Sequence, residues 1–238
     1  MKTLLPGATL GVLGGGQLGR MWSHAAQALG YRTAVLDPDA HSPAGLVSHL
    51  HVAADYLDPV ALQQMAAQCQ AITTEFENVP AEALRQLGLS LPCAPGAGPV
   101  AVAQDRAKEK AHFVACGVPV APHAVVHTAA DLTSVSADLL PGILKTTRLG
   151  YDGKGQVRVA SLADLPAAWK QLQSAGPAVC ILEKRLPLAA ECSVVLARGF
   201  DGQMVHLPVQ VNLHRDGILA VTEVCLQTPC LPPPNNKP

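Results

Sequence analysis

The 238-residue sequence has few aromatic residues and few charged residues. Three Phe, three Tyr and two Trp are too few for the stacking surface on which single-stranded nucleic acids bind. Charged residues make up 15% of the chain, and 17 Lys plus Arg against 18 Asp plus Glu leave a net charge of -1. This balance excludes binding to a polyanion through bulk charge. We therefore expect no nucleic-acid partner.

The sequence also lacks paired cysteines and long uninterrupted apolar runs. Its seven cysteines are scattered, and no two have the spacing C-x-x-C, which excludes a disulfide framework and a zinc knuckle. The uncharged segment 111–130 is broken by Pro and His, and the segment 3–19 is broken by three consecutive glycines. Neither segment is typical of a membrane span or a signal peptide. We expect a cytoplasmic protein without a membrane partner.

Hydrophobic residues make up 49% of the chain, enough for one or two domains with their own cores. In the first hundred residues, short apolar runs alternate with segments of helical periodicity, which predicts a parallel sheet with helices on its faces. The expected strands are 8–13, 33–36 and 71–74, and the expected helices are 20–29 and 60–69.

The pattern changes after the Pro/Gly-rich stretch 92–99, which is the expected domain boundary. The following segments predict antiparallel hairpins separated by helices, with a hairpin turn at 198–202. Residues 226–238 are rich in Pro and Asn and have no periodicity, so we expect a disordered tail. The expected strands are 142–146, 157–160, 179–183 and 192–197, and the expected helices are 105–116 and 162–173.

A glycine-rich loop with the pattern G-x-G-x-x-G, residues 14–19, joins the first expected strand to the first expected helix. Free N–H groups and the dipole at such a helix N-terminus attract a phosphate, and glycines let the backbone approach it. Asp37, at the end of the next strand, completes the spacing of a dinucleotide fingerprint. The same loop is also compatible with a tight turn, or with a phosphate site that does not belong to NAD.

Two further clusters carry candidate polar groups. Glu75 and Glu77 follow a strand that should end at the ligand-binding edge of the sheet, where carboxylates suit ribose hydroxyls; an acidic helix start is the alternative. Lys145 leaves a strand and precedes the loop 150–156, which has three glycines and a lysine. This loop predicts a flap of N–H donors and positive charge over a polyphosphate, and a solvated hairpin is the alternative.

These motifs, taken in order, resemble the 5-(carboxyamino)imidazole ribonucleotide synthetases, the ATP-dependent carboxylase subunits of bacterial purine biosynthesis, which are ATP-grasp enzymes. The resemblance runs from about residue 8 to about residue 221. The residues that carry it are 14–20, 74–80, Asp105, Arg106, Lys110, Lys145, 150–156, Glu183, Glu191 and 212–218.

The resemblance implies an α/β fold, in which a Rossmann-like parallel-sheet domain precedes an incomplete ATP-grasp α+β domain. The implied domains are 1–98 and 99–225, followed by the tail 226–238. Members of this family phosphorylate bicarbonate with ATP and transfer the carboxylate, through carboxyphosphate, to the amine of 5-aminoimidazole ribonucleotide. A homodimer is also compatible with the sequence.

The resemblance also implies the roles of individual residues. Those near the transfer centre are Tyr151, Asp152, His214 and Arg215. The ribonucleotide contacts are Gly16, Gln17, Leu18, Glu75 and Asn78. The ATP contacts are Arg106, Lys145, Gly150, Tyr151, Asp152, Gly153, Lys154, Gly155, Gln156, Glu183, Lys184, Arg185, Leu186, Glu191 and His214.

The sequence departs from the family after Glu191. The acids that would hold the Mg²⁺ bridging the ATP phosphates are expected on late strands, and only Asp201, Asp216 and Glu223 follow Glu191. We therefore expect no complete metal site and little turnover by this chain. Two alternative functions stay open: a nucleotide-binding or inert fragment, and an NAD-dependent oxidoreductase that uses the loop 14–19.

Overall fold

The computed structural model describes residues 3–150, 155–215 and 218–224. Its contacts divide the chain into two compact units, residues 1–119 and residues 120–238. The domain boundary expected between residues 98 and 99 stays a prediction, and the expected tail 226–238 lies outside the described residues. Among the helices of the described ranges, none has both the length and the apolar character needed to cross a bilayer.

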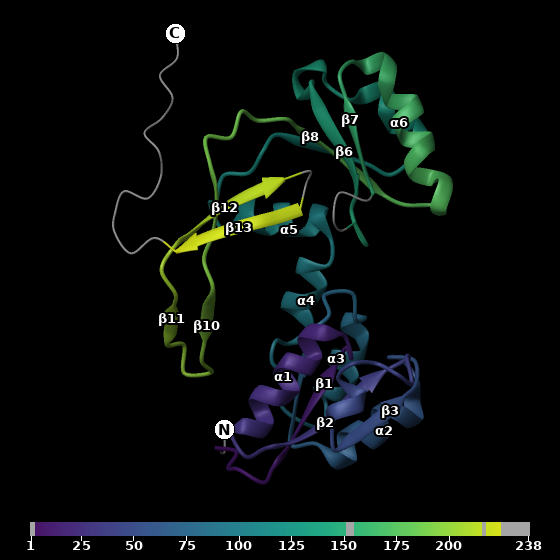
Figure 1. Ribbon diagram of the computed structural model, residues 1–238. Coiled ribbons are helices and arrows are strands. Elements are labelled where there is room, and N and C mark those ends of the chain that lie inside the picture. The colour runs from purple at the N-terminus through teal and green to yellow at the C-terminus, as the bar shows by residue number, and fades with distance from the viewer. Residues whose placement is uncertain (1–2, 151–154, 216–217, 225–238) are drawn as a thin grey trace. The chain divides into compact units, whose positions relative to one another are not determined.

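The first unit contains a four-stranded parallel sheet in the order β3-β2-β1-β4, which confirms the expected parallel sheet (Figure 1). The sequence predicted three of these strands, and β3 is the fourth. The strands are β1 (Thr9–Leu13), β2 (Arg32–Asp37), β3 (Leu50–Ala53) and β4 (Ala71–Thr74). The helices are α1 (Gln17–Ala28), α2 (Pro59–Gln68), α3 (Ala81–Leu87), α4 (Ala97–Ala103) and α5 (Arg106–Ala115).

Both faces of this sheet are covered, because successive side chains of a strand point to opposite faces. Leu13 and Leu36 are fully buried in a core that also includes residues of α2 and α3. Their neighbours Val12 and Val35 pack in a second cluster, together with Trp22 of α1. The apolar runs in β1 and β2 therefore follow from burial on both sides, as in other parallel sheets.

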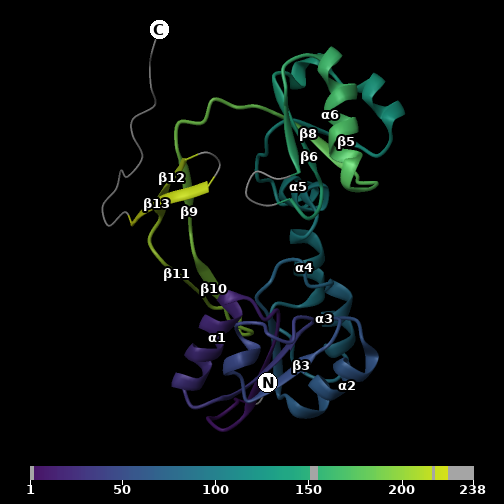
Figure 2. The ribbon, with the colours of Figure 1, turned by 45° about the vertical axis from the view of Figure 1, so that its right-hand side comes forward.

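The second unit begins with an antiparallel four-stranded sheet in the order β5-β8-β6-β7, and α6 lies along one face of it (Figure 2). Leu144, Leu182 and Leu165 form part of the core between sheet and helix. The strands are β5 (His123–Val126), β6 (Gly142–Thr146), β7 (Gln156–Val159) and β8 (Cys180–Lys184), and the helix is α6 (Leu165–Leu172). Short 3₁₀ turns are η1 (Gly45–Val47) in the first unit and η2 (Ala129–Ser134), η3 (Ala137–Leu139), η4 (Leu162–Asp164) and η5 (Gln173–Ala175) in the second.

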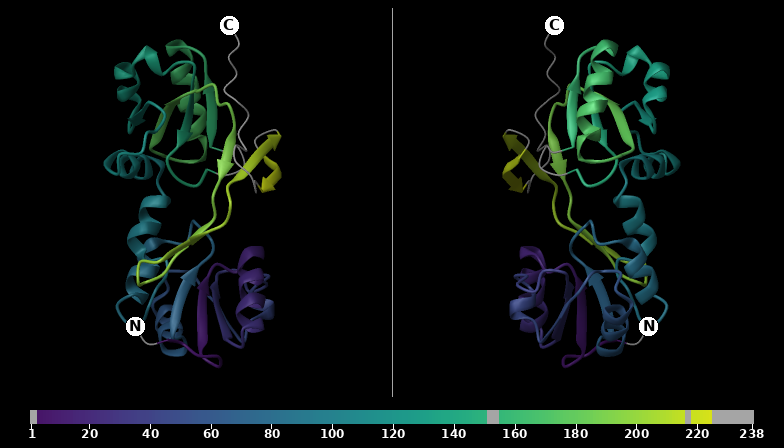
Figure 3. Two further views of the ribbon diagram at one scale, coloured as in Figure 1. Left: turned by 90° about the vertical axis from the view of Figure 1, so that its left-hand side faces the viewer. Right: turned by 90° about the vertical axis from the view of Figure 1, so that its right-hand side faces the viewer.

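The remaining strands form a two-stranded ribbon and a separate three-stranded sheet in the order β13-β12-β9 (Figure 3). The expected hairpin around residues 198–202 is confirmed by the antiparallel pairing of β10 with β11. The expectation of one strand over 192–197 is wrong, because residues 194 and 195 separate two strands that pair in different sheets. The strands are β9 (Glu191–Ser193), β10 (Leu196–Arg198), β11 (Met204–His206), β12 (Gln210–Arg215) and β13 (Ile218–Val224).

Candidate functional site

A pocket of about 370 Å³ lies at the carboxyl edge of the parallel sheet, where β1, β2 and β4 end. This is the edge at which open α/β sheets bind ligands. The pocket includes three of the predicted ribonucleotide contacts from the glycine loop, together with Glu75 from the end of β4. Its lining residues are Gly14, Gly15, Gly16, Gln17, Leu18, Asp37, Tyr56, Glu75 and Phe76.

The glycines allow the loop to turn tightly into α1. Gly14 has a φ of +104°, a conformation that favours glycine. A Cβ on Gly19 would lie 2.4 Å from the Gly14 carbonyl oxygen, so the helix can approach the loop only with glycine at this position. Gly16 caps α1 without a side-chain hydrogen bond. The N-terminus of α1 therefore presents backbone N–H groups and its positive dipole end at the pocket.

Asp37 holds this loop from the neighbouring strand. Its Oδ2 accepts hydrogen bonds from the Gly15 N–H at 2.6 Å and from the Tyr56 hydroxyl at 2.8 Å. Burial and the bond to Asp37 raise the pKa of Tyr56, so its hydroxyl keeps the proton that it donates. In a dinucleotide site the corresponding acid accepts from ribose hydroxyls. Here its Oδ2 is engaged by the chain itself, which disfavours the NAD alternative.

Glu75 is half-buried and follows β4 directly. Burial raises the pKa of its carboxyl group and the nearby Asp37 also raises it, while a hydrogen bond from the Gly19 N–H acts in the opposite direction. Asn78, three residues further along the chain, is half-buried and is not one of the residues that line the pocket. Glu75 therefore lines the pocket beside the glycine loop, and the expected ribonucleotide contact by Asn78 stays a prediction.

In the second unit, Lys145 of β6 forms an ion pair with Glu183 of β8, with Nζ 3.0 Å from Oε2. The two side chains are 20% and 14% exposed. They alternate along their strands with Leu144 and Leu182, which pack in the core beside α6. The ion pair therefore lies on the face of the sheet opposite to that core.

The predicted flap corresponds to the connection between the antiparallel strands β6 and β7. At its base, a Cβ on Gly155 would lie 2.7 Å from the Thr146 hydroxyl oxygen and 3.5 Å from the Gly150 Cα. Gly155 also has a φ of +69°. Glycine therefore permits both the turn and the close approach of the two strands. The remaining predicted flap residues, Tyr151, Asp152, Gly153 and Lys154, lie outside the described residues.

The end of β8 has most of its backbone donors engaged within the unit. The N–H of Lys184 donates to the Pro122 carbonyl and the N–H of Arg185 donates to the Pro141 carbonyl, both at 2.9 Å. The N–H groups of Lys184 and Arg185 are therefore not available to an adenine at this strand end.

Glu191 and His214 meet on the three-stranded sheet, where Glu191 Oε2 contacts His214 Nδ1. Glu191 pairs with Asn212 in the β9–β12 register, and His214 follows beyond a β-bulge. Arg215 is the last residue of β12 and is exposed. Arg106 is the first residue of α5, in the other unit.

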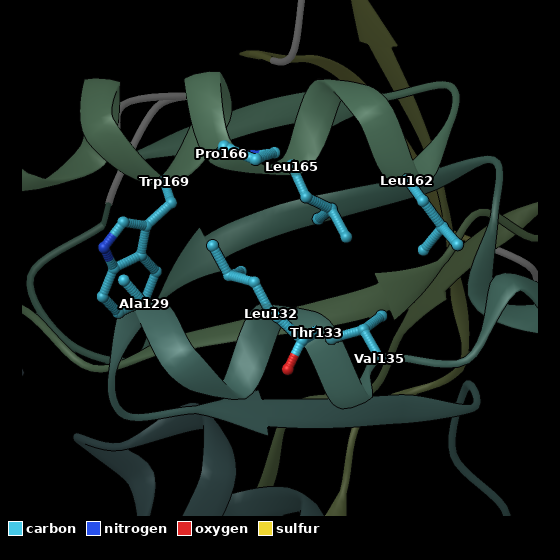
Figure 4. Close-up of a pocket in the computed structure, with 8 residues that line it drawn as sticks. All are labelled: Ala129, Leu132, Thr133, Val135, Leu162, Leu165, Pro166 and Trp169. Carbon is cyan, nitrogen blue, oxygen red and sulfur yellow. The ribbon is translucent and has the colours of Figure 1, made fainter.

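A larger hollow of about 400 Å³ lies between α6 and η2, in the helical layer of the second unit (Figure 4). Leu132, Leu165 and Trp169 point into it, and no charged side chain lines it. It lies on the helix side of the sheet, away from the Lys145–Glu183 pair. Its apolar lining does not suit a polyphosphate.

Within residues 3–150, 155–215 and 218–224, no three His, Cys, Asp or Glu side chains gather closely enough to hold a metal ion. Glu223 pairs with Val211, which is next to Asn212 in β12. The side chains of Glu223 and Asn212 therefore lie on opposite faces of their sheet. Whether this chain holds magnesium stays a prediction.

Comparison with known proteins assigns a family to each part of the chain. Residues 7–104 match the ribonucleotide synthetase preATP-grasp domain, and residues 111–230, half of the chain, match the ATP-grasp domain. The chain belongs to the ATP-grasp family. The α/β fold expected from the resemblance is thereby confirmed.

Individual relatives within this family are N5-carboxyaminoimidazole ribonucleotide synthases, which confirms the resemblance noted in the sequence. That of Brucella melitensis is 41% identical over 223 residues, 93% of this chain and 61% of the relative. The Staphylococcus aureus enzyme solved with ADP is 37% identical with a TM-score of 0.86, covering 93% of this chain and 59% of that one. An Aspergillus clavatus enzyme solved with ADP and 5-aminoimidazole ribonucleotide is 29% identical with a TM-score of 0.78. The match covers 92% of this chain and 57% of that one. The chain thus spans about three fifths of the length of the relatives that it matches.

The structure also identifies residues that the sequence did not. Tyr56 and Phe76 line the pocket, and Asp37, which also lines it, accepts a hydrogen bond from the Gly15 N–H. Tyr56 follows β3, so recognising that strand would have assigned this side chain to the same edge of the sheet.

Proposed function

We propose that this chain carries the ribonucleotide and ATP sites of an N5-carboxyaminoimidazole ribonucleotide synthase. In this reaction bicarbonate attacks the γ-phosphorus of ATP, which forms carboxyphosphate and releases ADP. The exocyclic amine of 5-aminoimidazole ribonucleotide then attacks the carboxyl carbon and releases phosphate. The product is the carboxylated amine, an intermediate of purine biosynthesis.

The observation that carries this proposal is the pocket at the carboxyl ends of β1 and β4, which combines a helix N-terminus with the Glu75 carboxyl group. A ribonucleotide has an anionic phosphate for the N–H groups of Gln17 and Leu18, and ribose hydroxyls that donate to Glu75. The solved relative from Aspergillus clavatus, which binds 5-aminoimidazole ribonucleotide together with ADP, supports this choice of ligand.

The ATP site lies in the second unit in this proposal. Phosphoryl transfer depends mainly on positioning and on compensating the charge of the phosphates. Lys145 supplies a cation on the face of its sheet away from α6, and Gly150 and Gly155 frame the base of the loop that we propose to cover the phosphates. Glu183, Glu191 and His214 complete the polar surface. The expected ATP contact by Arg106, which belongs to the first unit, stays a prediction. Tyr151, Asp152 and Arg215 act near the transfer centre.

Magnesium would compensate the phosphate charge further when bound. We further propose a cytoplasmic location and a homodimer.

A thermal-shift series with MgATP, 5-aminoimidazole ribonucleotide and NADH tests the proposal, since a ligand stabilises only the state that it binds. We expect MgATP and the ribonucleotide each to raise the melting temperature, and NADH to have no effect. Stabilisation by NADH alone would support the oxidoreductase alternative. No stabilisation by any of the three would support the inert fragment.

A further inference from the structure

Tyr56 lines the ribonucleotide pocket but has no role in the chemistry described above. It lies between β3 and α2, and its hydroxyl donates to Asp37 Oδ2 at 2.8 Å. The same oxygen accepts from the Gly15 N–H at 2.6 Å, and Asp37 Oδ1 accepts from the Asp39 N–H at 2.8 Å. The Asp37 carboxylate thus joins β2 to the glycine loop and to the segment that follows β3.

We propose that Tyr56 and Asp37 are positioning residues, which hold the loop Gly14–Gly16 so that the N–H groups at the start of α1 face the phosphate of the bound ribonucleotide. This inference rests on the proposed function, because it takes a ribonucleotide as the ligand of this pocket. Tyr56 acts on the ligand through Asp37 and Gly15.

The geometry explains why the loop needs such a hold. Gly14 and Gly16 have no side chains that could fix the backbone, and glycine loses more conformational freedom on ordering than any other residue. Hydrogen bonds that involve a charged group are shorter and stronger than those between neutral groups. The Asp37 carboxylate therefore provides one strong acceptor for Gly15, and the Tyr56 hydroxyl fixes the orientation of that carboxylate. A loop ordered before binding leaves less entropy to be lost when the ligand binds.

Removing one hydroxyl group tests the role of Tyr56. We expect Tyr56→Phe to weaken binding of 5-aminoimidazole ribonucleotide about fivefold to tenfold in calorimetric titration, the effect of losing one such hydrogen bond. MgATP affinity should stay unchanged. The matched control is Tyr31→Phe, since the Tyr31 hydroxyl donates to the Leu4 carbonyl at 3.0 Å and does not line the pocket. Asp37→Asn should weaken ribonucleotide binding at least as much as Tyr56→Phe does.

A measurement without ligand separates this inference from the proposed function. In the free protein, hydrogen exchange of a peptide covering residues 13–18 should be about fivefold or more faster in Tyr56→Phe than in the wild type, and unchanged in Tyr31→Phe. The Gly15 amide proton should also move upfield in Asp37→Asn. Equal exchange rates in wild type and Tyr56→Phe overturn the positioning role, whether or not the ribonucleotide binds. A further outcome is that exchange changes as expected while the wild type does not bind the ribonucleotide. In that case Tyr56 and Asp37 do order the loop, but the proposed substrate is wrong, and so is the inference that the ordered loop serves to bind it.

Discussion

The Lys145 ammonium lies 3.0 Å from the Glu183 carboxylate, across the neighbouring strands β6 and β8. The pair lies on the face of the sheet away from α6, where the backbone register brings the two side chains together. A phosphate that binds Lys145 therefore meets a cation whose position is already fixed by an acid. Lys145 is not a member of the apolar core beside α6, so its removal leaves that core intact.

We predict that Lys145→Ala lowers MgATP affinity at least tenfold, because a charge-assisted contact to phosphate is lost. The free energy of unfolding should fall by only about 1 to 2 kcal/mol, the effect of leaving Glu183 without this partner. Titration with a fluorescent ATP analogue and urea unfolding measure the two quantities.

The control is Lys170→Ala, which removes an exposed lysine from the last turn of α6, a helix that packs on the other face of this sheet. Neither quantity should change in that variant. Equal ATP affinity in wild type and Lys145→Ala would remove Lys145 from the nucleotide site.

Glu75→Ala should abolish stabilisation by 5-aminoimidazole ribonucleotide and leave stabilisation by MgATP intact, because Glu75 lies in the pocket of the first unit. Glu77→Ala is the matched control, since Glu77 is exposed and does not line the pocket. Thermal-shift measurements with each ligand suffice. Loss of both stabilisations in Glu75→Ala would mean that the two sites were wrongly separated.

The raised pKa of Glu75 predicts a dependence of stability on pH. The folded state binds this proton more tightly than the unfolded state does, so ionisation of Glu75 lowers stability as pH rises through the usual glutamate range. Glu75→Gln removes that effect. The difference in free energy of unfolding, Glu75→Gln minus wild type, should therefore increase from about pH 4 to about pH 7. Urea unfolding at several pH values measures the difference, and a decrease over this range would contradict the burial of the carboxyl group.

Two glycines of the loop should respond differently to alanine. In Gly19→Ala the new Cβ would lie 2.4 Å from the Gly14 carbonyl oxygen, and the backbone must shift, at a cost of about 1 to 3 kcal/mol. At Gly16, whose φ is -67°, a Cβ would have no neighbour nearer than Glu75 Oε2 at 4.0 Å. Gly16→Ala should therefore cost less than Gly19→Ala, at most about 1 kcal/mol because alanine is a poorer N-cap than glycine, and should weaken ribonucleotide binding. Chemical unfolding of both variants checks this, and equal losses of stability would contradict it.

Much of the first unit could be predicted from the sequence, because its signals are local. The runs in β1 and β2 are apolar since both faces of the sheet are covered, and the glycines of the loop mark a turn whatever ligand it binds. Glu75 could be assigned to the pocket because parallel strands end at one edge.

The missed features depend on tertiary contacts. Strand β3 is only four residues long and contains His51, so its pattern gave no signal, and Tyr56 beyond it was missed as well. The break between β9 and β10 falls inside the run Val194–Val195–Leu196, and apolar character alone does not reveal that the chain changes sheets there. The engagement of Asp37 by Gly15 and Tyr56 joins three separate segments and has no sequence signature.

Hydrogen exchange measured by mass spectrometry, with each ligand in turn, tests most directly whether the chain has one nucleotide site in each unit. We predict that 5-aminoimidazole ribonucleotide slows exchange in peptides covering residues 13–19 and 75–80, and that MgATP slows exchange in peptides covering residues 142–150 and 180–186. NADH should slow neither set. Protection of residues 13–19 by NADH, or protection of the same unit by both MgATP and the ribonucleotide, would contradict the account.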